Sequence, residues 1–413
     1  MGGMAVGLHT LDDFDLRGKK VLLRADINSP LDPMSGEILD TSRIKGYVQT
    51  LERLKDSKVI LIAHQSRPGK GDFTTLRRHS EVLNRLVKGR VSYIDDVFGS
   101  CAKKGIDSLS PGEVLVLENM RFCSEEVSKR ICGRPPIEQA KTHLVRRLSS
   151  YVDFYVNDAF AVSHRAQPSV VGFPMVLPCC IGPSMEREIT ALTKVLKSKE
   201  TPKVFALGGA KADDSFLITK NVLLKGVADK VLLSGVAALI FLMASGKDIG
   251  SANRDMVKDL GYNELVSEAG ELLKRFKGQI ELPVDLAFED NGGRSEASVD
   301  GFPDKKALDI GAETMKVFSK AIKDASVVIA KGPAGVFEIN GFGLGTESIL
   351  QSIADSKSLS VIGGGHLTTV AKRAGLRDKI SYIGSGGGAT VSFLSDQPLP
   401  GIEVMKKSGG GEQ

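Results

Sequence analysis

Short apolar runs alternate along this chain with longer segments in which apolar residues recur at every third or fourth position. Segment 41–57, for example, places Ile44, Val48, Leu51 and Leu54 on one face of a helix. The same spacing recurs in segments 76–88, 135–150, 214–227 and 309–325. Apolar runs that alternate with amphipathic helices predict a parallel sheet with helices on both faces.

This alternation occurs twice, and its two halves meet near residues 175–202. Segment 173–184 is rich in proline and turn residues, and segment 184–200 has an acidic start and a basic end that suit a helix dipole. We therefore predict an α/β protein of two Rossmann-like, doubly wound parallel-sheet domains joined by a hinge helix. The predicted boundaries are 1–183 for the N-terminal domain, 184–200 for the helix, 201–395 for the C-terminal domain, and 396–413 for a turn-rich tail packing near the N-terminal domain or the hinge.

The apolar runs of the first half end on charged or hydrogen-bonding side chains. The cations at or near these ends are Arg24, His64, Arg67, Arg121 and Arg165, with Arg43 in the first turn of a predicted helix. Ligands of a parallel sheet bind beyond the carboxyl ends of its strands, and arginine forks suit phosphate and carboxylate oxygens. We therefore expect a site for a small anion, with Asp26 and Asn28 as acceptors for a hydroxyl group.

The apolar runs of the second half end on glycine instead. They are segments 204–211, 231–235, 327–335, 361–366 and 382–389. Glycine lets backbone N–H groups approach a phosphate, especially at the start of a helix, and Lys211 adds an ammonium after the first pair of glycines. We therefore expect a ligand with phosphate groups, although the chain has no Walker loop.

The composition narrows the class of protein. Hydrophobic residues make up 42% and charged residues 25% of the chain, as in an ordinary soluble protein, and a net charge of +5 is too mild for a typical nucleic-acid binder. Five cysteines without metal-binding spacing predict free thiols in a reducing compartment. Segment 231–246 is predicted to be strand, glycine turn and helix, and no signal peptide is recognised. We expect a cytoplasmic monomer or small homo-oligomer without nucleic-acid or membrane partners.

The motifs, taken in order, resemble those of the phosphoglycerate kinase family. The residues that carry the resemblance are RADINSP (24–30), SRIK (42–45), HQSRP (64–68), ENMRF (118–122), NDAF with HR (157–165), GGAK (208–211), LPVD (282–285), KGPAGVFE (331–338), GGGH (363–366) and SGGGA (385–389). They extend over nearly the whole chain. The variants HQSRP and GGGH are similar to those of archaeal members.

The resemblance implies reversible phosphoryl transfer between 1,3-bisphosphoglycerate and ADP, giving 3-phosphoglycerate and ATP in glycolysis and gluconeogenesis, with Mg²⁺ carried as Mg-ATP or Mg-ADP. By matching positions, the N-terminal domain would bind 3-phosphoglycerate through Asp26, Asn28, Arg43, His64, Arg67, Arg121 and Arg165. The C-terminal domain would bind the nucleotide through Gly209, Lys211, Gly235, Pro333, Glu338, Gly363, Gly364 and Gly365. The resemblance also implies direct in-line transfer after domain closure, with Arg43 and Lys211 as the catalytic residues that stabilise the charge.

Two positions depart from the family's pattern. Ser215 stands where the family usually has a second lysine, and His366 stands where an aspartate usually follows the triple glycine. Magnesium prefers oxygen ligands, so the metal role is not assigned to His366. The metal ligands stay unknown at this point, and a contribution from Asp213 or Asp214 is left open.

Two other functions remain as alternatives. Segment GSGGGA (384–389) matches a dinucleotide fingerprint, with Glu403 at a suitable distance for a ribose contact, which would make the protein a nicotinamide-dependent dehydrogenase. However, the chain ends soon after Glu403 and leaves no room for the rest of a Rossmann half. The other alternative is a two-domain protein that binds anions without catalysis.

Overall fold

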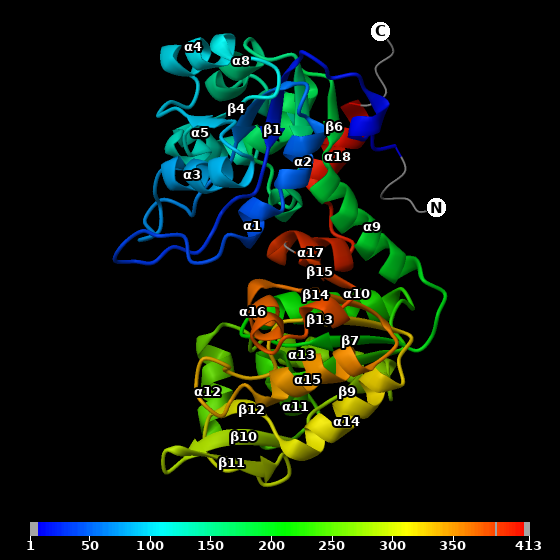
Figure 1. Cartoon of the computed structure of the whole chain (residues 1–413). Coiled ribbons are helices and arrows are strands. Elements are labelled where there is room, and N and C mark those ends of the chain that lie inside the picture. The colour runs from blue at the N-terminus through cyan, green and yellow to red at the C-terminus, as the bar shows by residue number, and fades with distance from the viewer. Residues whose placement is uncertain (1–6, 385, 409–413) are drawn as a thin grey trace. The chain divides into compact units, whose positions relative to one another are not determined.

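The chain divides into two compact units in a computed structural model, which describes residues 7–384 and 386–408. Unit 1 comprises Met1–Thr190 and Pro398–Gln413, and unit 2 comprises Ala191–Gln397. The helix α9 (Pro183–Lys197) carries the chain from one unit to the other, close to the predicted segment 184–200. The two units are described separately below, and their elements can be followed in Figure 1.

Unit 1 is built on a parallel sheet with the strand order β3-β4-β2-β1-β5-β6. Its strands are β1 (Lys20–Arg24), β2 (Lys58–Ile62), β3 (Val91–Tyr93), β4 (Val114–Val116), β5 (Phe154–Asn157) and β6 (Cys179–Ile181). The strands are short apolar runs because both faces of the sheet are covered. In β1, Val21 and Leu23 pack with one group of helices, while Leu22 between them faces the other side.

The helices of unit 1 lie on both faces of this sheet. They are α1 (Ser42–Lys45), α2 (Val48–Arg53), α3 (Arg77–Leu86), α4 (Ser100–Ser108), α5 (Ser124–Val127), α6 (Lys129–Cys132), α7 (Pro136–Gln139), α8 (His143–Ser149) and α18 (Pro400–Ser408). Helices α1 to α3 contribute Ile44, Leu51 and Leu83 to the core on one face. The doubly wound arrangement predicted from the apolar spacing is therefore confirmed for this unit.

Three predicted elements of unit 1 have different bounds. Segment 41–57 is not one helix, because it turns at Gly46 between α1 and α2, where glycine weakens a helix. Segment 135–150 is likewise broken between α7 and α8. The backbone of Thr142 is extended there, and its hydroxyl donates to the Gln139 carbonyl. The tail predicted to be turn-rich contains α18, and the Gly401 N–H in that helix donates to the Ser163 carbonyl at 2.9 Å. Residues 409–413 lie outside the described part.

Unit 2 repeats the architecture with the strand order β15-β14-β13-β7-β8-β9, again parallel. Its strands in this sheet are β7 (Lys203–Leu207), β8 (Lys230–Leu233), β9 (Ile280–Glu281), β13 (Val327–Lys331), β14 (Leu359–Gly363) and β15 (Tyr382–Gly384). A separate antiparallel sheet, absent from the sequence-based prediction, joins β10 (Asp285–Asp290) to β11 (Gly293–Ser298) and β12 (Ala307–Ile310).

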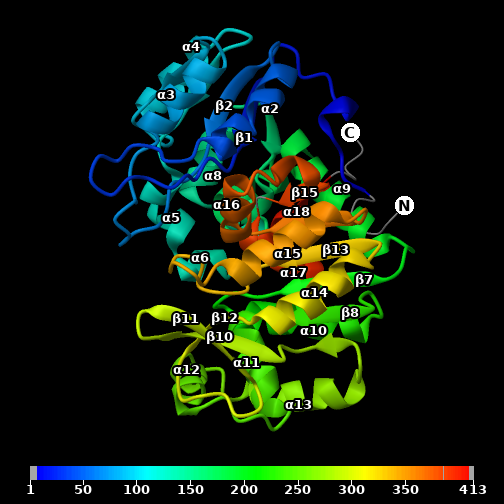
Figure 2. The same ribbon diagram turned by 60° about the horizontal axis from the view of Figure 1, so that its bottom comes forward.

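The helices of unit 2 also cover both faces of the parallel sheet. They are α10 (Ala212–Leu224), α11 (Gly235–Ala244), α12 (Ser251–Asp259), α13 (Leu265–Arg275), α14 (Ala312–Lys323), α15 (Leu344–Asp355), α16 (Gly365–Arg373) and α17 (Gly387–Leu394). Figure 2 shows α14 and α15 side by side on one face, where Phe318 and Leu350 enter the core. Segment 231–246 forms strand, glycine turn and buried helix as predicted. In the described part of the chain, no helix is long and apolar enough to cross a membrane.

Candidate functional site

The sequence-predicted anion site of unit 1 lies at the carboxyl edge of its sheet. Arg24 is the last residue of β1, where it pairs in register with Ile62 of β2 and Asn157 of β5. His64 follows β2, and Arg121 lies in the short turn after β4. Because β4, β2, β1 and β5 are neighbours, their carboxyl ends bring these side chains to one edge.

Arg43 is held against this edge by an ion pair. Its Nη1 donates to Oδ2 of Asp26, whose side chain is only 5% exposed, whereas the Arg43 side chain is 36% exposed. The Asp26 N–H donates to the hydroxyl of Tyr47 at 2.6 Å. The Arg43 side chain is therefore oriented by Asp26 and remains partly exposed to solvent.

Arg24 is fully buried and determines the tautomer of His64. Its Nη2 lies 3.3 Å from Nδ1 of His64, and an arginine nitrogen can only donate, so Nδ1 is the acceptor and Nε2 carries the proton. Burial lowers the pKa of His64 well below 6.5, and the charges of nearby arginines act in the same direction: Arg24, Arg121, Arg165 and Arg43. His64 is therefore a neutral N–H donor, suited to an anionic ligand.

Glu126 is linked to Arg24 by hydrogen bonds through Ser169, and the sequence analysis did not identify it. Nε of Arg24 donates to Oγ of Ser169 at 3.1 Å, and that hydroxyl donates to Oε1 of Glu126 at 2.6 Å. Ser169 lies in the single π-helical turn Pro168–Gly172, and its own N–H also bonds Glu126 at 2.9 Å. A glutamate in a polar segment such as SEEVSKR has no pattern that predicts burial, so only the fold identifies this partner.

Two of the predicted loops are joined by amide side chains. Oδ1 of Asn28 accepts the Ser66 N–H at 2.9 Å. The amide of Gln65 pairs with both backbone groups of Ser29, at 3.0 Å each, and also accepts Nε2 of His79 at 3.0 Å. The two hydrogen bonds between the Gln65 amide and the Ser29 backbone thus hold the loop after β1 to the loop after β2, as paired backbone groups hold neighbouring strands together. It is a functional neighbour that the sequence analysis missed.

Arg121 has a buried side-chain donor at this edge that suits an anionic ligand. Its Nη1 donates to the Ser66 carbonyl, while its buried Nη2 has no hydrogen-bond partner within the described residues. Burial, and then the charges of Arg165 and Arg24, lower the pKa of Arg121 to about 10. The side chains of Arg67 and Arg165 both reach solvent, and partial burial, followed by the charge of Arg67, lowers the pKa of Arg165. A bound anion would reduce the electrostatic repulsion among these cations.

His79 should make the stability of the protein depend on pH. Burial lowers its pKa to about 4, so below the ordinary value of 6.5 the unfolded chain binds a proton that the folded chain does not, and stability falls as pH falls from about 6.5 towards 4. Between pH 7 and pH 5 we expect wild type to lose about 2 kcal/mol more than His79→Leu. Urea unfolding at both pH values measures this. Equal losses would mean that His79 is protonated in the folded protein.

In unit 2 the structure brings together three of the glycine loops. Gly235 adopts φ +58°, and a Cβ there would lie 2.7 Å from the backbone N of Gly209. Gly332 adopts φ +77°, and a Cβ there would lie 2.1 Å from the Gly208 carbonyl oxygen. A Cβ on Gly208 would in turn meet the carbonyl oxygen of Pro333 at 2.4 Å. Glycine is therefore required here by close packing of backbone against backbone.

Other predicted nucleotide residues, Lys211 and segment 363–365, lie at the carboxyl ends of β7 and β14, the two strands that flank β13. Lys211 is exposed and immediately precedes α10. Gly363 ends β14 beside Lys331 of β13, and Gly364, at φ +101°, caps α16, which begins at Gly365. Added Cβ atoms at Gly364 and Gly365 would meet nothing within 4 Å, so this helix start is open to a ligand. The exposed His366, in place of the family's usual aspartate, packs its ring 5.3 Å from the ring of Phe337.

Glu338 lies in an exposed loop that is anchored by a buried ion pair. Nη1 of Arg294 donates to Oδ2 of Asp309 at 3.0 Å and to the Gly341 carbonyl at 2.8 Å, and Asp309 also accepts the Gly345 N–H at 2.9 Å. Burial raises the pKa of Asp309 to about 6. This pair holds the chain that follows Glu338, at Gly341 and Gly345, and no motif in the sequence indicated Arg294.

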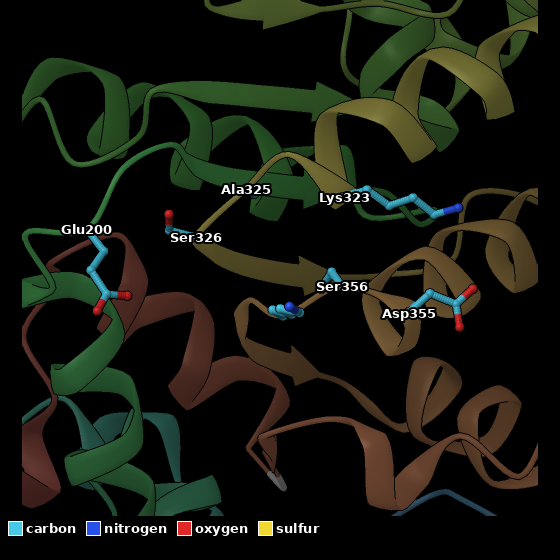
Figure 3. Close-up of a pocket in the computed structure, with 7 residues that line it drawn as sticks. Glu200, Lys323, Ala325, Ser326, Asp355 and Ser356 are labelled. Atoms are coloured by element: carbon cyan, nitrogen blue, oxygen red, sulfur yellow. The ribbon is translucent and has the colours of Figure 1, made fainter.

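The pocket in Figure 3 belongs to the opposite edge of the unit 2 sheet. It has a volume of about 460 Å³ and lies among Glu200, Lys323, Ala325, Ser326, Asp355, Ser356 and Lys357. Ser326 precedes β13 and Lys357 precedes β14, so the pocket faces the amino ends of the strands. No group of three metal-binding side chains occurs within residues 7–384 and 386–408.

The dehydrogenase alternative fails on the position of Glu403. In a dinucleotide fingerprint the acidic residue follows the second strand of a βαβ unit. Glu403 instead lies in α18 of unit 1, where it pairs with Lys406 at 3.0 Å, and no strand follows α17 in the described part. Segment 384–389 ends β15 and begins α17 in unit 2, with Ser385 outside the described residues.

Comparisons with known proteins agree with the motif assignment. The family model for phosphoglycerate kinase matches residues 11–397. Phosphoglycerate kinase of Methanothermus fervidus is 48% identical over 402 residues, covering 97% of each chain, and that of Methanosarcina mazei is 48% identical over 402 residues, covering 96% of this chain and 94% of the relative. The crystal structure of the Pyrococcus horikoshii OT3 enzyme superimposes with a TM-score of 0.89 at 39% identity, covering 97% of this chain and 98% of that one. That of Coxiella burnetii gives 0.79 at 26% identity, covering 97% and 99%.

Proposed function

We propose that this chain, which belongs to the phosphoglycerate kinase family, transfers a phosphoryl group reversibly between 1,3-bisphosphoglycerate and ADP, giving 3-phosphoglycerate and ATP. The observation that carries the proposal is the buried Nη2 of Arg121, which lacks a partner among the described residues at an edge crowded with cations. An anion with several acceptor oxygens would complete this edge. The alternative of a nicotinamide dehydrogenase has no support.

Unit 1 would hold the glycerate substrate. The side chains proposed to contact it are Asp26, Asn28, Arg43, His64, Arg67, Arg121 and Arg165. His64 would donate through Nε2, because Arg24 occupies Nδ1. Asp26 accepts from Arg43 and so would leave fewer acceptors for a substrate hydroxyl than a free carboxylate.

Unit 2 would hold the nucleotide. The residues proposed to line its site are Gly209, Lys211, Gly235, Pro333, Glu338, Gly363, Gly364 and Gly365, with Glu338 on the ribose hydroxyls. The helix starts at α10 and α16 present N–H groups to phosphate oxygens, and glycine keeps the backbone accessible.

The transfer itself requires positioning and charge more than covalent chemistry. The moving phosphoryl group spreads charge over its equatorial oxygens while the attacking and leaving oxygens stay in line. We propose that Arg43 and Lys211 stabilise this charge after domain closure, which would also exclude water from the acyl phosphate. Because Arg43 belongs to unit 1 and Lys211 to unit 2, the reaction would need both units to be loaded.

Mg²⁺ would enter with the nucleotide. Its usual ligands are phosphate oxygens, water and one or two carboxylates, and the first turn of α10 offers Asp213 and Asp214. Asp213 accepts from the Tyr262 hydroxyl at 3.1 Å, and Asp214 pairs with Lys331 at 3.1 Å. These carboxylates fit the ion's chemistry, and the ion would neutralise phosphate charge when bound. The proposed setting is the cytoplasm, with monomers or small homo-oligomers.

A coupled assay tests the proposed function directly. Purified protein is given 3-phosphoglycerate and Mg-ATP, and formation of 1,3-bisphosphoglycerate is followed through reduction by glyceraldehyde-3-phosphate dehydrogenase and NADH. We expect turnover that depends on both substrates. Binding of both without turnover would instead favour the anion-binding alternative.

Arg121 provides the test of the substrate site. We expect 3-phosphoglycerate to raise the thermal midpoint of wild type, since a ligand that binds only the folded state stabilises it. Arg121→Met should weaken 3-phosphoglycerate binding about 10- to 100-fold, because a charge-assisted contact is lost. Scanning calorimetry and titration calorimetry measure both effects.

The matched control is Arg130→Met, which removes the same charge from an exposed position on α6. It should keep the affinity of wild type for 3-phosphoglycerate. Equal affinity in all three proteins would show that the substrate does not contact Arg121.

A further inference from the structure

Lys331 occupies a central place among the phosphate-binding loops, and the sequence analysis gave it no role. It is the last residue of β13, the strand between β7 and β14. In register it stands beside Leu207, just before GGAK, and beside Gly363, the first glycine of GGGH. Its side chain is therefore carried between the two loops proposed to bind phosphates.

The ammonium of Lys331 is held close to the start of α10. Its Nζ donates to Oδ2 of Asp214 at 3.1 Å, and the two side chains are only 12% and 29% exposed. The next residue, Gly332, packs on the backbone of Gly208 so closely that no Cβ fits. These contacts leave the Lys331 backbone little freedom, and they place its charge beside the GGAK loop.

Ser215 cannot supply a second charge to this site. It is fully buried, and its hydroxyl donates to the Gly208 carbonyl at 3.1 Å. An ammonium has three donors, and among the described residues Asp214 is the one acceptor within hydrogen-bond distance of Lys331. Two donors thus stay available at the carboxyl edge of the sheet.

We propose that Lys331 is a phosphate-binding residue of the nucleotide site, donating to the terminal phosphate oxygens of ADP and ATP while Asp214 orients it. The proposal rests on the proposed function, because it takes the glycine loops of unit 2 to be the nucleotide site. It gives the site two lysines, Lys211 and Lys331, although position 215 is a serine.

The first experiment compares ADP with adenosine by titration calorimetry in EDTA, so that no metal takes part. Lys331→Met should bind ADP about 10- to 100-fold more weakly than wild type, since one charge-assisted contact to phosphate is lost. Adenosine binding should stay within about twofold, because it has no phosphate. The control Lys323→Met removes an exposed lysine at the amino ends of the same sheet and should bind ADP as wild type does.

The second experiment separates phosphate binding from neutralisation of Asp214. The ADP affinity of Lys331→Met/Asp214→Asn is compared with that of Asp214→Asn alone. If Lys331 contacts phosphate, the double variant stays about tenfold weaker or more. If Lys331 only cancels the Asp214 charge, the two variants bind ADP equally and the proposal is wrong.

Remaining outcomes are distinguishable. A wild type that binds neither ADP nor ATP would overturn the nucleotide site and thus the proposed function itself. Wild-type binding together with unchanged ADP affinity in Lys331→Met, or an equal loss for adenosine, would overturn only the role of Lys331. Should Lys331→Met unfold, Lys331→Gln retains a donor for Asp214 and is expected to show the same selective loss for ADP.

Discussion

Arg43→Ala is expected to lower kcat about a thousandfold, while the KM for 3-phosphoglycerate rises less than about tenfold. The physical reason is that the proposed contact to the moving phosphoryl group exists mainly in the transition state, so its loss affects the rate more than substrate binding. In the structure Asp26 orients Arg43, whose side chain is still 36% exposed. Steady-state kinetics in the coupled assay measure both constants.

The matched control for Arg43 is Arg53→Ala. Arg53 lies in the neighbouring helix α2 and pairs with the exposed Asp12, so the same charge is removed from the same unit. Its kcat should stay within about twofold of wild type, because exposed ion pairs contribute little. A kcat near that of wild type in Arg43→Ala would show that Arg43 does not stabilise the transferred group.

Gly332→Ala is expected to have the largest effect on stability. A Cβ at this position would lie 2.1 Å from the Gly208 carbonyl oxygen and 2.5 Å from its carbonyl carbon, and backbone atoms cannot rotate away as a side chain can. We expect the free energy of unfolding to fall by about 4 kcal/mol or more. Urea unfolding followed by circular dichroism measures the loss, and added ADP identifies the transition of unit 2.

Gly246→Ala separates backbone strain from this clash. Gly246 has a similar φ of +84°, but an added Cβ would meet nothing within 4 Å, so the substitution should lower the free energy of unfolding by only about 1 to 2 kcal/mol. Similar losses in the two variants would mean that the Gly208 and Gly332 loops separate easily. Their contact would then not be what shapes the proposed phosphate site.

Strand ends could be predicted from the sequence because apolar runs stop where side chains leave the core. The positions of Arg24, His64 and Arg121 follow directly from this rule, since each ends or closely follows a strand of one sheet. The rule cannot separate a buried cation from an exposed one. Arg24 and Arg67 both follow apolar runs, yet Arg24 is fully buried against Ser169 and His64, whereas Arg67 is exposed.

The residues that the sequence analysis missed share one property: their partners are distant in the chain. Glu126 reaches Arg24 through Ser169, 43 residues further on, and Arg294 reaches the Gly341 loop across 47 positions. Neither lies in a periodic pattern or a motif. A hydrogen bond between residues far apart in the chain produces no recognisable spacing of residues in the local sequence. The broken helix at Gly46 was missed for a different reason, since apolar spacing continues through this turn because Ile44 and Leu51 pack on the same core.

The sequence by itself determined the two parallel sheets, the cations at one carboxyl edge and the glycines at the other, because these depend on local spacing and on the chemistry of single residues. The tertiary structure decided which of those residues act together. Close approach of Gly208 and Gly332 places Lys331 beside GGAK, and the Arg24 contact leaves His64 with its proton on Nε2. Both depend on distances between segments far apart in the chain, which packing sets and residue order alone does not.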